Sequence, residues 1–140
     1  MLAKHMDKHV DSFWVIWPIF IVFSVWSCAL TQKDMEEKRI TSAYQKIYVV
    51  DHHYKKIMTA ASDMYRHGLL FEDEKEAIIR QGQIVYNYQR IISEQLLHTR
   101  KKVDAGLIAD EDFEAIESYI PLLEKELLNL HSLADSLGVL

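Results

Sequence analysis

The chain has 140 residues, a net charge of −5 and a single cysteine. This length fits one small domain beside any terminal segment, the acidic balance disfavours a nucleic-acid partner, and one cysteine excludes an internal disulfide framework. Four glycines and two prolines leave few positions that break a helix, so we expect an all-α fold.

Residues 1–12 form a short polar tail in which lysines and aspartates balance. His5 and His9 are four residues apart and could share one helix face, as metal ligands often do. A third ligand is not in view, so we interpret both as solvated histidines.

The next stretch, Phe13–Leu30, is an apolar run of 18 residues without a charged side chain. As a helix it would rise about 27 Å, close to the thickness of the hydrocarbon core of a bilayer. Trp14 and Trp17 lie near one end and Trp26 near the other, as in aromatic belts at the membrane interface. The run therefore predicts a membrane segment, whose membrane-embedded residues include these tryptophans, Phe20 and Phe23.

Cys28 closes this run and is preceded by Val25, Trp26 and Ser27, with Lys4 and Lys8 at the basic start. This arrangement resembles the lipobox of bacterial prolipoproteins. The resemblance implies cleavage before Cys28 and lipidation of its thiol. The alternative is an uncleaved signal anchor, in which Cys28 is one more apolar residue.

Basic residues flank the run on both sides, so the positive-inside rule favours neither orientation of the segment clearly. A short tail ahead of an apolar run is typical of a signal or a signal anchor. We therefore expect a cytoplasmic N-terminus and the rest of the chain on the periplasmic or extracytoplasmic side of a membrane.

Residues 31–140 are expected to form an elongated antiparallel three-helix bundle, because three helical patterns alternate with short glycine-containing turns. The helices are predicted over about 33–67, 73–105 and 110–137. Thr31 with Asp34 could cap a new helix, although one continuous helix from the apolar run remains open. In the third helix, Pro121 is expected to kink or split it.

Each predicted helix carries an apolar stripe at helical spacing. Gly82 interrupts the second stripe and either admits a close neighbour or is a tolerated weak position. The stripes comprise Ile40, Tyr44, Ile47, Val50, Tyr54, Ile57, Met58, Ala61 and Met64, then Ile78, Val85, Tyr88, Ile92, Leu96, Thr99 and Val103, then Ile116, Ile120, Leu123, Leu127, Leu130, Ala134 and Leu137.

The two predicted turns are alike. Gly68 and Gly106 are each followed by two aliphatic residues, an acidic cluster and Glu-Ala-Ile, at an offset of 38 residues. Two copies are too few for a helical repeat array, so we interpret them as one local solution used twice. The acids of the second copy, residues 110–112, lack the spacing of an EF-hand loop, which argues against a calcium site.

The sequence offers no catalytic constellation, cofactor motif or metal site, because nucleophile and phosphate-loop patterns are absent. His52 and His53 are adjacent and would point about 100° apart on a helix, which disfavours joint metal binding. We therefore predict a protein that is not an enzyme and needs no cofactor.

The pattern favours a membrane-anchored helical adaptor or structural protein of the bacterial envelope. Its expected partners are membrane lipid and another envelope or membrane protein, with homo-oligomers left open. Phage inner-membrane spanins are similar in architecture alone. Candidate contact residues are Tyr48, Tyr86, Arg100, Lys101 and Lys102. The alternative is a single-pass accessory subunit that packs into a larger membrane complex through its apolar segment.

Overall fold

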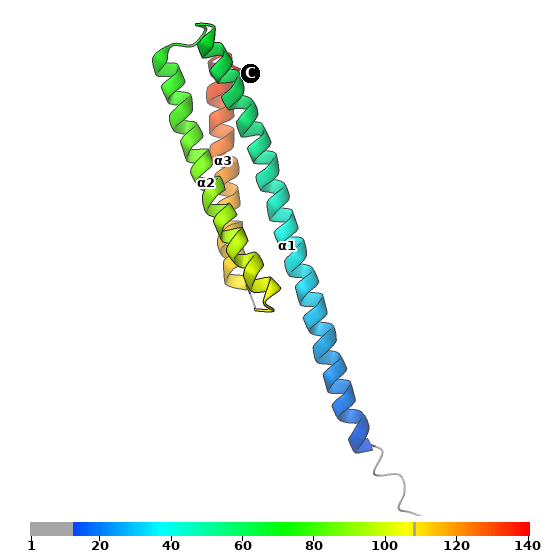
Figure 1. Cartoon of the computed structure of the whole chain (residues 1–140). Helices are drawn as coiled ribbons and strands as arrows, with labels where there is room; N and C mark the ends of the chain where they lie inside the picture. The colour runs from blue at the N-terminus through cyan, green and yellow to red at the C-terminus, as the bar shows by residue number, and fades with distance from the viewer. Residues whose placement is uncertain (1–12, 108) are drawn as a thin grey trace, which may run out of the picture. The chain divides into compact units, whose positions relative to one another are not determined.

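The computed structural model describes the backbone of residues 13–107 and 109–140, and the side chains of residues 32–107 and 109–140. Three helices follow one another: α1 (Phe13–Arg66), α2 (Glu72–Asp104) and α3 (Asp110–Ser136). The described residues contain no strand, which confirms the all-α prediction. The chain divides into two units, Met1–Glu36 and Glu37–Leu140, and the second unit holds most of α1 with α2 and α3 (Figure 1).

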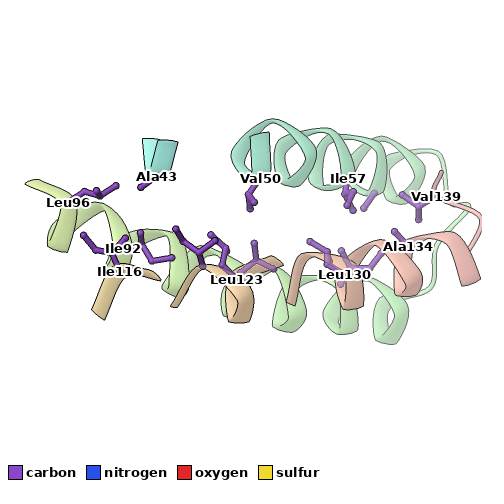
Figure 2. Packing of buried hydrophobic residues seen from close by; sticks show 14 of the residues in the cluster. Ala43, Val50, Ile57, Ile92, Leu96, Ile116, Leu123, Leu130, Ala134 and Val139 are labelled. Carbon is purple, nitrogen blue, oxygen red and sulfur yellow. The ribbon is translucent and has the colours of Figure 1, made fainter. Parts of the chain in front are cut away.

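The second unit is a three-helix bundle with an apolar interior to which every helix contributes. Figure 2 shows Val50 and Ile57 of α1 pointing toward Leu123 and Leu130 of α3, and Ile92 of α2 next to Ile116 of α3 farther along the bundle. These side chains are at most 4% exposed, so the interior excludes water along the bundle. Tyr44, which the stripe of α1 also predicted as interior, is instead 43% exposed.

Two predicted interruptions do not divide the helices. Of the two alternatives at Thr31, the structure has the continuous one, since α1 extends through this residue. The helix α3 also continues through Pro121. A proline removes one backbone donor, and the buried neighbours Ile120 and Leu123 keep this helix packed on both sides of it.

Glycines end all three helices in the same way. Gly68, Gly106 and Gly138 have φ angles of 69°, 71° and 69°, a left-handed conformation that favours glycine. After α1, the amide of Gly68 donates to Tyr65 O at 3.0 Å and the amide of Leu69 donates to Met64 O at 2.9 Å. This is a Schellman pair of bonds, and the same pair follows α2 and α3. The shared local solution expected for the two turns is therefore observed.

The predicted membrane segment Phe13–Leu30 lies outside the residues whose side chains are described. From residue 32 to the C-terminus, leaving out residue 108, no helix combines the length and apolar character needed to cross a membrane.

Candidate interaction surfaces

The helices α1 and α2 approach each other closely at Gly82. A Cβ atom added to Gly82 would lie 3.0 Å from Met58 Sδ and 3.5 Å from Tyr54 Cε2. Such a contact with sulfur is tighter than ordinary van der Waals packing. Of the two interpretations of Gly82, the structure therefore supports close approach of a neighbouring helix, and it places Tyr54 against α2.

Tyrosines gather beside this contact, on the flank of α2 that adjoins α1. Burial raises the pKa of the Tyr54 hydroxyl, and the nearby Tyr86 and Asp51 raise it further. Asp51 Oδ2 accepts a hydrogen bond from Lys55 Nζ at 2.7 Å. This bond raises the pKa of Lys55, and Tyr48 raises it slightly further. We call Tyr48, Asp51, Tyr54, Lys55 and Tyr86 the tyrosine surface.

The tyrosine surface leaves its two outermost rings open to solvent. Tyr48 is 73% exposed and Tyr86 is 55% exposed, whereas the interior beneath is filled by aliphatic side chains. The phenol of Tyr54 keeps its proton at neutral pH, because even the ordinary tyrosine pKa of 10.0 lies well above it and burial raises the pKa of Tyr54 further. The surface thus combines apolar ring faces with neutral hydroxyl donors and one acid–base pair, which suits an amphipathic protein partner.

Two of the three basic residues proposed as contacts are paired with carboxylates. Arg100 Nη2 lies 3.3 Å from Glu37 Oε1 on α1. Lys102 Nζ lies 2.6 Å from Asp112 Oδ2 on α3. Lys101 is exposed. Arg100 follows Tyr86 by 14 residues, about 21 Å along a helix. The structure therefore does not bring the basic triplet into the tyrosine surface.

Acidic residues at the helix starts make contacts that helix-dipole reasoning missed. Asp110 Oδ1 lies 3.3 Å from Arg39 Nη1, although the two residues belong to different helices. Arg39 also lies 2.9 Å from Glu117 and its guanidinium carbon stands 4.3 Å from the centre of the Phe113 ring. These contacts tie α1 to α3, so the acids of the second turn serve packing as well as the dipole.

Three members of the tyrosine surface, Asp51, Tyr54 and Lys55, were not predicted as site residues. Tyr54 was assigned to the interior stripe, and Asp51 and Lys55 have the spacing of four that marks a helical ion pair. That spacing was a usable signal for the pair. Proximity of Tyr54 to Tyr86 had no sequence signal, because it depends on how α1 and α2 align.

The described histidines and acidic residues do not form a metal site. His52 and His53 pack edge to face with ring centroids 6.0 Å apart. Among the residues that the structure describes, no group of three or more His, Cys, Asp and Glu side chains could hold a metal ion. The candidates His5 and His9 fall outside those residues, as do the side chains of Trp14, Trp17, Phe20, Phe23, Trp26 and Cys28.

Comparison with protein families, with curated proteins and with solved structures finds no match for this chain. Any functional assignment therefore rests on the residues and contacts described above.

Proposed function

We propose that the chain is a non-enzymatic, membrane-anchored helical adaptor or structural protein of the bacterial envelope. In this proposal the charge-free run Phe13–Leu30 attaches the chain to a membrane, by spanning it or through a lipid on Cys28. The bundle then stands on the periplasmic or extracytoplasmic side and binds another envelope or membrane protein.

The tyrosine surface is the observation that supports this proposal most. The bundle interior is closed by its own aliphatic side chains, so the exposed rings of Tyr48 and Tyr86 add little to folding. Aromatic side chains contribute strongly to binding when a partner buries them. Exposed tyrosines beside the Asp51–Lys55 ion pair, whose charges cancel, therefore favour a binding role over a structural role within the bundle.

A second candidate function follows from the apolar run. Trp17, Phe20 and Phe23 place bulky aromatic side chains within a charge-free segment. Such residues could pack against other membrane helices, and the chain would then be an accessory subunit of a larger membrane complex.

An exchange of the anchor separates these two functions. Residues 13–29 are replaced by an unrelated membrane segment, and partners are then captured from solubilised membranes with the full-length chain as reference. The adaptor proposal expects the exchanged chain to keep its partners. Loss of every partner, with the bundle still helical by circular dichroism, would move the function into the membrane segment.

The lipid on Cys28 has its own test. Metabolic labelling with a fatty-acid analogue should mark the full-length chain, and Cys28→Ser should abolish the label. An intact, unlipidated chain by mass spectrometry contradicts lipidation and leaves the signal anchor.

A further inference from the structure

A second exposed surface lies on the opposite flank of α2, where it adjoins α3. Gln81, Tyr88 and Gln95, spaced by seven residues, all contact α3, and Tyr88 meets Tyr119 with ring centroids 6.3 Å apart. Aliphatic side chains three residues after these contacts point outward beside them. They are Ile84 at 41%, Ile91 at 38% and Leu122 at 42% exposure.

This surface is free of charge although 26% of the chain is charged. We call Ile84, Tyr88, Ile91, Tyr119 and Leu122 the uncharged face. Its nearest neighbours between these positions, Asn87, Ala115 and Ser118, are uncharged too, whereas the charged residues Arg80, Glu94 and Lys125 mark its edges in the same helical rows. A contiguous apolar surface of this kind on a small bundle is typical of an interaction site.

Polar contacts border the uncharged face at both ends, always with the donor on α2 and the acceptor on α3. At one end Gln81 Nε2 donates to Glu126 Oε2 at 2.8 Å. At the other end Gln95 Nε2 donates to Asp112 Oδ1 at 3.4 Å and Lys102 Nζ to Asp112 Oδ2 at 2.6 Å. The α2 border therefore carries donors and the α3 border carries carboxylates.

We propose that the uncharged face binds a second copy of this chain, in parallel, about a two-fold axis that runs along the bundle. This symmetry sets α2 of each copy opposite α3 of the other at the same level. The four helices then alternate in direction around a shared apolar layer, as in antiparallel four-helix bundles. At both borders the donors of one copy, each bonded to a carboxylate of its own chain, face the carboxylates of its partner, whose oxygens can accept further hydrogen bonds.

The antiparallel alternative lacks this match of donors with carboxylates. It would set α3 of one copy on α3 of the other, reversed about Tyr119. Asp112 precedes Tyr119 by seven residues and Glu126 follows it by seven. The two carboxylates would then face each other across the interface with no donor of the partner between them, although Lys102 balances the charge of Asp112 within each chain. The parallel arrangement also suits two chains held in one bilayer, and this last point alone rests on the proposed function.

Photo-crosslinking in membranes tests the occupant of the face. The full-length chain carries p-benzoylphenylalanine at position 122 or, as the matched control, at position 128. Leu128 is 67% exposed and lies six residues along α3, about 120° away around the helix. Irradiation should give a product of twice the chain mass from position 122 and little from position 128.

The attachment site tests the direction. When chains of two isotopic compositions are mixed, the crosslink from position 122 should fall on α2 of the other copy, near Ile84 and Tyr88. Crosslinks to α3 of the other copy overturn the parallel arrangement. Products with a different protein, or equal yields from both positions, overturn the second copy as the occupant.

Charges introduced at uncharged positions of the face give an independent test in detergent. Leu122→Glu should weaken self-association about 10-fold or more, whereas Leu128→Glu, with the same change in net charge, should leave it unchanged. A chain with Leu122→Glu mixed with one carrying Ile84→Lys should form mixed dimers by sedimentation. Unchanged association of the Leu122→Glu chain with retained helicity, or no mixed dimers, contradicts the proposal.

This outcome is separable from that of the proposed function. Self-association is read without any other protein, and Leu122→Glu leaves the tyrosine surface intact. Partner capture by the Leu122→Glu chain therefore reports on the adaptor function alone.

Discussion

Tyr86 and Tyr88 are two residues apart on α2, yet they lie in different surroundings. On the flank that adjoins α1, Tyr86 neighbours Tyr54 near the Asp51–Lys55 pair. On the flank that adjoins α3, Tyr88 packs near Tyr119 among uncharged side chains. One helix can therefore present two surfaces, on either side of its interior row, that suit partners of different chemistry.

The largest effect is expected from the interior row that supports both surfaces. Ile92 is fully buried, so Ile92→Ala should lower the free energy of unfolding by about 2–5 kcal/mol. Chemical denaturation of the full-length chain in detergent measures this loss. The adjacent Ile91→Ala is the control. Because Ile91 is 38% exposed, that change should cost less than about 1 kcal/mol, and equal costs would show that the row is assigned wrongly.

A smaller effect, confined to the tyrosine surface, is expected from a substitution at Gly82. Gly82→Leu should cost about 1–3 kcal/mol, because the new side chain would displace Met58 and Tyr54. It should alter the tyrosine surface while leaving self-association through the uncharged face in place. Sedimentation and partner capture on the same preparation make the comparison, and loss of both activities would argue against separate surfaces.

Substituting Tyr86 and Tyr88 one at a time tests whether the two surfaces act separately. Tyr86→Ala should weaken partner binding by about 1–2 kcal/mol, roughly 5- to 30-fold, and leave dimers intact. Tyr88→Ala should weaken dimers by a similar factor and leave partner binding intact. Each variant is the control of the other in capture and sedimentation assays. A loss of both activities in either variant contradicts the separation.

The smallest effect is expected from acid at the border of the uncharged face. Hydrogen bonds from Gln81, then from Asn129, lower the pKa of Glu126 below its ordinary 4.5. A lowered folded pKa adds stability above pH 4.5, and this stability is lost as the pH falls through the folded pKa. The contribution should stay below about 1 kcal/mol because Glu126 is only partly buried and water screens its carboxylate. Denaturation of the Gln81→Ala chain between pH 6 and pH 3, read as a difference from the parent, should show a shallower dependence.

The sequence alone determined the helical character of the chain and the rows that face inward. Three stripes at helical spacing required an apolar interior, and residues such as Ile78, Val85 and Leu123 are buried as those stripes predicted. Gly68 and Gly106 marked the helix ends, because a left-handed residue is needed to close a Schellman turn. These features depend on neighbours within one helix, which the sequence lists in order.

The tertiary structure decided what lies between helices. The proximity of Tyr54 to Tyr86, the link from Arg39 to Asp110 and the donor–acceptor borders of the uncharged face join residues that are 10 to 71 positions apart. Such contacts depend on the rotation and axial alignment of packed helices, which helical periodicity leaves undetermined. The apolar stripes could place a side chain inside or outside, but only the packed bundle could show which exposed side chains meet.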